Sequence, residues 1–484
     1  MADSNRASLA YIEETNFNEV PDPEVSVTGT VTVTAPSTLT SDSTAAGPDF
    51  SGFSVGDKIV TSGFTNTENN GLFTIASVDT DTDTAHEIVV EEDTLVSETD
   101  AEDVTINSAI VFQNFRFTDE SLAANTDTTQ SEEIRPDRQV SDTIRTQISV
   151  EGDISWEFSA KTHDDLLEGF AMSKWSEYLD LSGTVSAVSV GTGDDYDKFT
   201  SDTDAGGPDL SNVIVGQWIE TRDFTNSENN SYFKVMSLDT STDVHEIEVA
   251  GTDLVDEADA TDVKIDGSVL TNGVERKSYT FEKRFNDLPD ADAFQTFHGC
   301  RIGTMDLDVS ADAILTGSFG VSGAGFDPAQ DGPTADDYLE AGTERVMNAI
   351  DHVSYLREGS KLIELDVMSI SLSGDNNLRT QTAIGNLPPI GIGIGTISFT
   401  GNMEVYHTTR DLLNKYLSFE DTSVSFLLKD FDGNAYMFEL EAMNYTEGAA
   451  NVGGQDEDVM TELAFSAKVG GTSGKTFVIT RFKP

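Results

Sequence analysis

Basic residues, cysteine and long apolar runs are all scarce in this sequence. It contains 28 Lys and Arg residues against 87 Asp and Glu residues, which gives a formal net charge of -59 at pH 7. Because a DNA-binding protein needs a basic surface to face the phosphates, this charge argues against DNA binding. The single cysteine, Cys300, excludes an intrachain disulfide and any metal site built from several cysteines.

Membrane insertion and secretion are not expected either. No apolar stretch approaches the roughly 20 residues that span a bilayer. Residues 1–5 contain no basic region that leads into an apolar one, so the sequence predicts no signal peptide.

The acid excess has two interpretations. One is a solvated surface adapted to high salt, on which carboxylates keep the protein hydrated; this favours a halophilic host. The other is a surface that must not adhere to nucleic acid. The two are compatible with each other.

Catalytic motifs are also missing from the sequence. It has no Gly-rich phosphate loop before a helix, no Ser-His-Asp arrangement with supporting context, no HExxH and no clustered cysteines. Acids are so abundant that proximity in sequence singles out no catalytic pair. We therefore expect neither an enzyme nor a cofactor.

What the chain does contain is alternation of apolar and polar residues. In residues 147–158 one face carries Ile148, Val150, Ile154, Trp156 and Phe158. The intervening residues are polar, which is typical of a half-buried β-strand. Residues 163–170 follow, with acids in the first turn of a predicted short helix. Because turn residues recur about every ten positions along the chain, we expect an all-β fold with only short helices.

This scaffold occurs twice. The motif Gly152-Asp153-Ile154-Ser155-Trp156 returns as Gly395-Thr396-Ile397-Ser398-Phe399. The helix signal Asp165-Leu166-Leu167 returns as Asp411-Leu412-Leu413, with three extra residues before it. We expect the second copy to run from about residue 346 to the end of the chain.

Two inserts interrupt the first copy and are repeats of each other. Phe64-Thr65-Asn66 with Glu68-Asn69-Asn70 returns 160 residues later as Phe224-Thr225-Asn226 with Glu228-Asn229-Asn230. His86-Glu87-Ile88 returns as His245-Glu246-Ile247 after a one-residue deletion. Such a constant offset over some eighty residues indicates duplication. Each insert predicts a small β-barrel of about five strands, with Asn-rich hairpin turns.

Neither insert carries a convincing metal site. His86 and His245 have no second histidine or cysteine at ligand spacing, so we interpret them as polar residues at strand ends.

The repeats predict the domain organisation of the chain. It consists of a discontinuous first scaffold domain (1–25, 107–182 and 266–345), two inserted β domains (26–106 and 183–265) and a second scaffold domain (346–484). The predicted fold class is all-β, with sandwich or barrel scaffold domains that each carry a short helix.

The scaffold contains a set of distinctive motifs: residues 8–15, residues 115–122, Ser131-Glu132-Glu133-Ile134-Arg135-Pro136-Asp137-Arg138-Gln139-Val140, and residues 152–158 with Asp164-Asp165-Leu166-Leu167. Together these motifs resemble the major tail tube proteins of long, non-contractile-tailed viruses. The resemblance covers the scaffold, which is about two-thirds of the chain. The inserts look like the small β domains that such proteins carry outside the tail.

The resemblance implies a structural protein of the virion tail that is assembled in the host cytoplasm. Tube domains of this family form six-fold rings, which stack into a hollow tube through which the viral DNA passes without specific binding. Two tube domains in one chain imply a homotrimeric, pseudo-six-fold ring, with a homohexamer as the alternative. The implied partners are further copies of the chain and the tail terminator, tail tip and tape measure proteins, with no membrane.

Two sets of residues are expected to serve the tube. Acids on the polar faces of alternating strands would line the lumen and repel DNA phosphates: Glu151, Asp153, Glu157, Glu282, Asp306, Asp308, Glu404, Glu439, Glu441 and Glu462. A long loop would contact a neighbouring subunit or ring through Glu132, Glu133, Arg135, Asp137, Arg138 and Arg145. We expect its arginines to pair with carboxylates of that neighbour.

Other classes of protein remain open from the residues alone. An acidic adhesin-like β protein of the cell surface would also contain repeated small β domains. The lack of a signal peptide and the nesting of the repeats in a duplicated scaffold count against it. A capsid-decorating viral protein and an enzyme are further alternatives.

Overall fold

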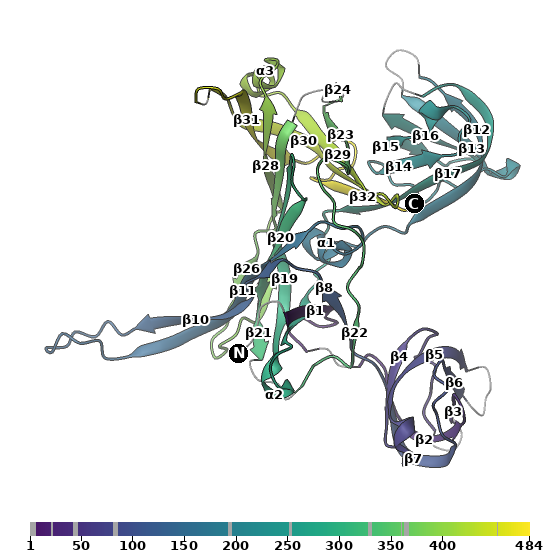
Figure 1. Ribbon diagram of the computed structural model, residues 1–484, viewed down its shortest axis with the longest axis vertical. Coiled ribbons are helices and arrows are strands. Elements are labelled where there is room, and N and C mark those ends of the chain that lie inside the picture. Colours follow the sequence, from purple (N-terminus) through teal and green to yellow (C-terminus); the bar gives the residue numbers. More distant parts are fainter. Residues whose placement is uncertain are drawn as a thin grey trace. The chain divides into compact units, whose positions relative to one another are not determined.

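The computed structural model describes residues 6–20, 23–41, 47–80, 86–191, 196–250, 254–327, 332–359, 361–362, 367–452 and 454–484. The chain forms two compact units. Unit 1 consists of Met1–Phe115, Tyr279–Gly299 and Gly325–Ala341, and unit 2 of Arg116–Ser278, Cys300–Ala324 and Gly342–Pro484. Strands dominate both units, which confirms the predicted all-β class (Figure 1). The α-helices in these ranges are α1 (Asp164–Ala171), α2 (Asp290–Ala293) and α3 (Asp411–Ser418).

The first insert is a closed six-stranded barrel in unit 1. Its strands are β2 (Ser26–Thr34), β3 (Thr38–Ser41), β4 (Lys58–Ser62), β5 (Gly71–Asp79), β6 (His86–Val90) and β7 (Glu98–Ser108), in the order β2-β3-β6-β5-β4-β7. The prediction of about five strands was wrong by one, because β3 has only four residues and follows β2 after a tight turn. β7 pairs with both β2 and β4, so closure leaves no free strand edge.

The second insert, in unit 2, repeats this pairing. Its strands are β12 (Leu179–Ser189), β13 (Asp197–Asp202), β14 (Trp218–Arg222), β15 (Tyr232–Asp239), β16 (Val244–Ala250) and β17 (Glu257–Thr271). They pair in the order β12-β13-β16-β15-β14-β17, and β17 returns to β12. Each barrel encloses its own cluster of buried Val, Ile, Leu and Phe side chains.

The repeated Asn-Asn motif is explained by a buried hydrogen-bond network. Asn229 donates to the Val255 carbonyl at 2.9 Å and accepts from the Val255 amide at 2.9 Å. Its amide also donates to Glu257, which accepts the backbone N–H groups of Thr225 and Asn226. Burial acts to raise the pKa of Glu257, but these hydrogen bonds together hold it below its ordinary value.

The first insert contains the same network. Asn69 makes the matching bonds to the backbone of Val96 and to the Glu98 carboxylate. The turn therefore depends on side-chain bonds that only these residue types can make, and this gives the repeat its clear sequence signal.

The scaffold part of unit 1 is a small sheet. β1 (Ala7–Glu13) pairs antiparallel with β18 (Tyr279–Phe285) and with β8 (Val111–Phe115), and β22 (Asp337–Leu339) runs parallel to β8. β21 (Gly325–Asp327) pairs with the start of β19 (Phe294–Ser310). The short helix α2 ends where β19 begins.

Unit 2 contains one continuous antiparallel sheet of eight strands, which includes residues 300–310 of β19. Its other strands are β10 (Ala123–Gln130), β11 (Thr143–Glu157), β20 (Thr316–Gly323), β25 (Val367–Asp375), β28 (Ser398–Tyr406), β30 (Ala435–Val452) and β31 (Val459–Lys468). The order is β10-β11-β20-β19-β25-β28-β31-β30. The predicted alternation in residues 147–158 is confirmed, since Val150, Ile154 and Trp156 are buried.

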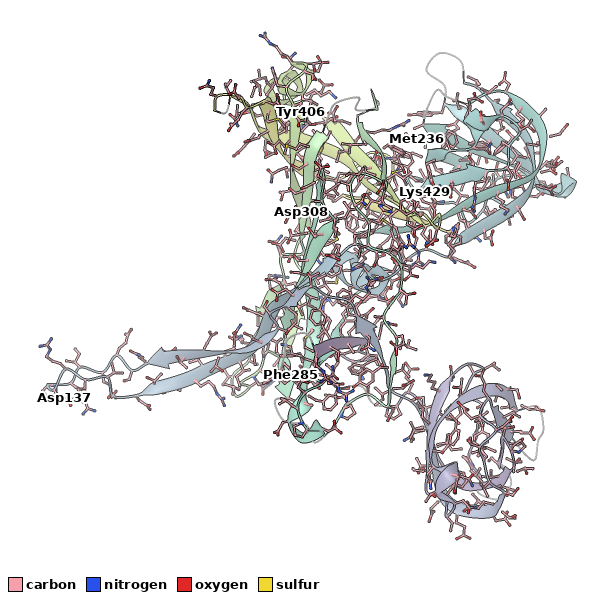
Figure 2. The ribbon with its side chains drawn as sticks, in the orientation of Figure 1. Asp137, Met236, Phe285, Asp308, Tyr406 and Lys429 are labelled. Carbon is pink, nitrogen blue, oxygen red and sulfur yellow. The ribbon has the colours of Figure 1, made fainter. Side chains whose placement is uncertain are left out.

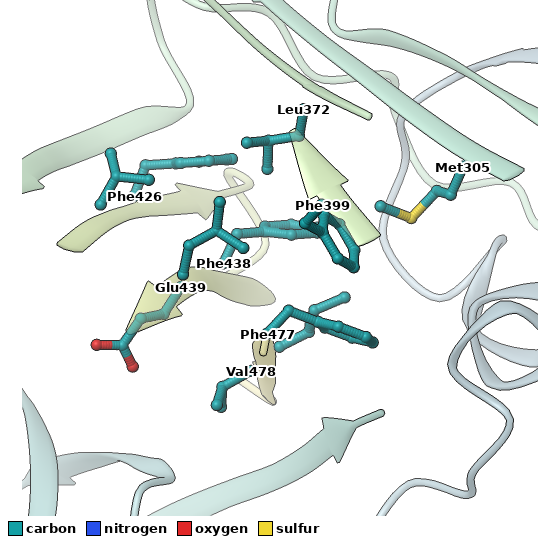
Figure 3. A pocket seen from close by; sticks show the side chains of 11 residues that line it. Met305, Leu372, Phe399, Phe426, Phe438, Glu439, Phe477 and Val478 are labelled. Atoms are coloured by element: carbon teal, nitrogen blue, oxygen red, sulfur yellow. The ribbon is translucent and has the colours of Figure 1, made fainter. Parts of the chain in front are cut away.

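A second sheet of unit 2 packs against the second half of the first. It contains β24 (Lys361–Leu362), β23 (Val353–Glu358), β29 (Thr422–Lys429), the first part of β30, β32 (Val478–Phe482) and the end of β17. Phe399, Phe438 and Phe477 converge around a core cavity of about 10 Å³ that strands of both sheets line (Figure 3). Short strands β9 (Asp119–Glu120), β26 (Arg379–Gln381) and β27 (Gly391–Gly393) complete the unit.

The two predicted scaffold helices are confirmed and end alike. α1 and α3 each have eight residues. Each is followed by a left-handed residue, Met172 with φ 51° and ψ 44°, and Phe419 with φ 52° and ψ 45°. Both caps let a backbone N–H return to a carbonyl of the last turn.

Candidate functional site: the acidic face of the eight-stranded sheet

One face of the eight-stranded sheet is polar across its whole width. Directly paired residues point to the same side of a sheet, so the register decides which side chains share this face. Asp306 pairs with Ser318 on one side and with Ser373 on the other. We call this side the acidic face. It consists of every second residue, counted from the first, in the segments 123–127, 147–157, 304–310, 316–320, 369–375, 398–404, 447–451 and 462–466.

The acidic face carries many carboxylates and, within these segments, neither lysine nor arginine. Its acids are Asp127, Glu151, Asp153, Glu157, Asp306, Asp308, Asp375, Glu404, Glu447 and Glu462. The remaining positions are Ser, Thr, Asn, Gln, Ala or Gly. The opposite side of the sheet is apolar and buried, as at Met305, Phe319 and Phe399. The sheet therefore offers solvent a surface of one charge sign.

Seven of the ten predicted lumen acids lie on this face. They are Glu151, Asp153, Glu157, Asp306, Asp308, Glu404 and Glu462. All seven side chains are exposed or half-buried. The structure thus brings together residues that come from four strands and from both copies of the scaffold.

The other three predicted acids lie elsewhere. Glu282 is buried in unit 1, where it accepts hydrogen bonds from the Thr334 amide at 2.6 Å and from the Tyr338 hydroxyl. Glu439 is buried in the second sheet of unit 2, and Glu441 accepts a 2.9 Å bond from the Ser473 amide. Their strands alternate in sequence as the others do, but another layer covers the polar side.

Sequence reasoning missed three acids of the face. Asp127 adjoins the β-bulge between β10 and β11, and Glu447 follows the bulge at Thr446. A bulge shifts the phase of alternation by one residue, so only the strand pairing places these two acids on the face. Asp375 is the last residue of β25, in phase with the serines before it.

The acids of the face repel one another locally. Glu404 and Glu462 are direct cross-strand partners, and like charges in that arrangement are unfavourable. With Glu447 they border an open groove of about 530 Å³. Partial burial raises the pKa of Asp308, and the nearby Asp306 carboxylate raises it further.

The predicted contact loop forms the end of the β10–β11 hairpin, which extends beyond the rest of its sheet, with Asp137 at the tip (Figure 2). All six predicted side chains, Glu132, Glu133, Arg135, Asp137, Arg138 and Arg145, are exposed. Ile134 and Val140 at the tip are also exposed, to 101% and 58%.

One arginine of this hairpin already has an acidic partner. Arg135 donates two hydrogen bonds to Asp137, at 3.1 and 3.0 Å, and this pairing holds the pKa of Asp137 below its ordinary value. Among the three arginines predicted to bind a neighbour's carboxylates, Arg138 and Arg145 have no acidic partner in the described part of the chain.

A buried ionic site joins the second insert to the second scaffold copy, and no sequence pattern predicted it. Lys234 and Trp218 of the barrel donate to the two oxygens of Glu439, both at 2.8 Å. The Glu439 carboxylate points away from the aromatic core, as Figure 3 shows. Trp218 packs there with Leu427, Met437 and Phe482.

The histidines of the inserts have structural roles. His86 accepts a hydrogen bond from the Phe50 amide at 3.1 Å, and His245 accepts one from the Leu210 amide at 3.2 Å. Across the described ranges, no three His, Cys, Asp or Glu side chains are arranged to hold a metal ion. The helices of those ranges are also too short or too polar to cross a bilayer.

These features define a class of protein: an all-β structural subunit with an acidic, base-free sheet surface. A family model described as "Phage tail tube protein" matches residues 4–467, and the chain therefore belongs to the phage tail tube protein family. It is a structural component of the virion tail. A comparison with curated proteins returned no match. The family match gives no support to a cell-surface adhesin.

Proposed function

We propose that three copies of this chain close into a ring of pseudo-six-fold symmetry, and that such rings stack into the tail tube. The eight-stranded sheet carries this proposal, because its two halves have equivalent strand orders. The first half is β10-β11-β20-β19 and the second is β25-β28-β31-β30. Each half would be one sixth of the ring, and the alternative is a ring of six chains.

Several local features support the equivalence of the halves. In each half, the second strand leads into an eight-residue helix with a left-handed C-terminal residue. The last strand of each half is long and contains a β-bulge, at Gly303 in β19 and at Thr446 in β30. Inside one chain, β19 of the first half already pairs with β25 of the second.

In this proposal the acidic face lines the bore. Duplex DNA carries a dense line of phosphates, and binding to it depends on cations that replace its counterions. A wall with carboxylates and no lysine or arginine offers none, so DNA would slide without binding. Salt screens the repulsion between the carboxylates and the phosphates. The screening length is about 8 Å at physiological ionic strength and becomes shorter in high salt.

The remaining assignments follow the same arrangement. The discontinuous first tube domain (1–25, 107–182 and 266–345) and the second (346–484) would build the wall, and the inserts at 26–106 and 183–265 would lie outside it. The β10–β11 hairpin would contact a neighbouring subunit or ring. The tail would be long and non-contractile, its other partners would be the terminator, tip and tape measure proteins, and the subunit would have no enzymatic activity.

Electron microscopy of the purified protein across a salt series tests this function. The proposal predicts hollow, stacked rings whose assembly improves as salt screens the acidic surfaces. Monomers at every salt concentration, even when virion extract is added as a seed, would contradict it.

A further inference from the structure

Both ends of the eight-stranded sheet have a free edge. Among the described residues, β10 pairs only with β11. Within the part of the chain that the structure describes, residues 447–452 of β30 pair only with β31, because the pairing of β30 with β29 ends at Met443. Side chains along both edges are mostly exposed. A long edge of unpaired backbone groups is a template for another strand.

The junction inside the chain shows how two such edges meet. β19 and β25 pair antiparallel over seven residues, from Thr304 opposite Asp375 to Ser310 opposite Ser369. On the acidic face of this junction, Asp306 stands opposite Ser373. β30 is the second-half equivalent of β19, and β10 is the first-half equivalent of β25.

The bulges align the two long strands residue by residue. Gly303 is the extra residue of β19, and Ile302 before it pairs with Val321. Thr446 is the extra residue of β30, and Tyr445 before it pairs with Phe465. Asp306 and Ala449 therefore occupy equivalent positions, each three residues after its bulge.

The pairings of the neighbouring strands extend this alignment to β10 and its equivalent, β25. Val321 pairs with Gly152, and Phe465 pairs with Gly401, so these two glycines are equivalent. One residue earlier in each strand, Glu151 pairs with Ala123 and Thr400 pairs with Ser373. Ala123 and Ser373 are therefore equivalent as well.

We propose that β30 of one chain pairs antiparallel with β10 of the next chain in one defined register, with Ala449 opposite Ala123. In this register Glu447 stands opposite Asn125, and Gly448 opposite Ala124. The register rests on the proposed ring, and it names the surface and the partner, a second copy of this chain.

The side chains fit this register. It sets small residues against each other and places the Glu447 carboxylate opposite the Asn125 amide, so no two acids are direct partners between residues 447 and 452. A slip of two residues toward the hairpin tip would set Glu447 against Asp127. Opposed acids are unfavourable, so charge helps to select the register.

Disulfide trapping tests the register. A disulfide needs Cβ atoms about 3.5–4.5 Å apart. Directly opposed residues of an antiparallel pair, with Cβ atoms about 4.5–5.5 Å apart, reach this distance with a small shift, whereas diagonal partners at about 7–8 Å do not. The test variant is A449C/A123C. The off-register variant is A449C/N125C, and the internal control is D306C/S373C, which occupies the equivalent positions within one chain. Native Cys300 is buried and stays in all three.

Assembled samples are checked by microscopy, oxidised, and run on a denaturing gel without reductant. We expect linked dimers and trimers for A449C/A123C, at least ten-fold fewer for A449C/N125C, and only internally linked monomers for D306C/S373C. If A449C/A123C does not assemble, a mixture of chains carrying one cysteine each should give dimers that neither gives alone.

The outcomes separate the register from the function on which it rests. Rings or tubes in which A449C/A123C does not link, or in which A449C/N125C links as well, would overturn the register and leave the tube intact. A ladder that continues to six chains would support the register and contradict the trimer. Wild-type protein that never forms rings would overturn the proposed function and the register with it.

Discussion

Lys234 Nζ lies 2.8 Å from Glu439 Oε1, in a site where both residues are almost fully buried. The lysine belongs to the second inserted barrel, and the glutamate belongs to the second scaffold copy. The equivalent of Lys234 in the first insert, 160 residues earlier, is Thr74, and the equivalent of Trp218 is Lys58. The duplicated barrels thus differ where the second one is bound to its scaffold.

Substitution K234M should destabilise unit 2 by about 3–5 kcal/mol, because it leaves a buried carboxylate without its cation. Chemical denaturation at pH 7.5 measures this loss. The matched control is T74M in the first insert, where no buried charge depends on the side chain, and its effect should stay below about 1 kcal/mol. Equal losses in the two variants would show that the ion pair is not the cause.

The loss caused by K234M should also depend on pH. Burial raises the pKa of Glu439 above its ordinary value of 4.5, and Lys234 opposes that rise. Without the lysine, the folded state binds the proton still more tightly than the unfolded state. Stability of the variant must then fall as the pH rises above about 4.5. The gap to wild type should therefore be smaller at pH 4.5 than at pH 8, and a constant gap would contradict this explanation.

Substitution N229A should destabilise the second barrel by about 1–3 kcal/mol or more, since it leaves the Val255 amide and carbonyl without their hydrogen-bond partner. N69A should do the same in the first barrel, where Asn69 binds Val96. Hydrogen exchange measured on each barrel separates the two effects. Each variant should lose protection in its own barrel only, and loss in both would mean that the inserts are coupled.

Reversing charge on the acidic face should make the tube retain DNA. The variant E151K/E404K places a lysine on each half of the sheet, where it can replace counterions of the phosphates. Fluorescent DNA should bind assembled tubes of this variant and be released as salt rises. The control E87K/E102K reverses two exposed acids of the first insert and should retain DNA no better than wild type. Equal retention in both would show that the face does not meet the DNA.

Removing the arginines at the hairpin tip should weaken assembly. Arg135 already binds Asp137, so R135A/R138A removes one internal pair and one cation without an acidic partner. Without these cations, the acidic surfaces of neighbours repel more strongly, above all at low ionic strength. Sedimentation across a salt series should show a larger assembly defect in low salt. The control K264A/R276A changes two exposed cations elsewhere in unit 2, and a defect as large there would contradict a specific role for the hairpin.

The all-β class, the short helices and the duplicated inserts could be predicted, because each depends on local pattern. Asp411-Leu412-Leu413 begins a helix as expected, and the Asn69 and Asn229 turns repeat because the same side-chain bonds recur. The sixth barrel strand was missed because four residues are too few to show alternation.

The acidic face could be predicted only in part. Glu151 and Glu439 stand in equally regular alternating strands, but one side chain is exposed and the other is covered by a second layer. Glu447 was hidden by the bulge at Thr446, which shifts the alternation by one position. The wrong placement of Glu439 and the omission of Glu447 have the same origin. Layer packing and strand pairing decide these positions, and the alternation of residues in one strand contains no information on either.

The number of chains in one ring tests the central claim most directly. Native mass spectrometry of the smallest closed ring, released from tubes without cross-linking, counts the copies of the 52.2 kDa chain. The duplicated sheet predicts three copies. A ring of six would contradict the assignment of each half-sheet as one sixth of the wall.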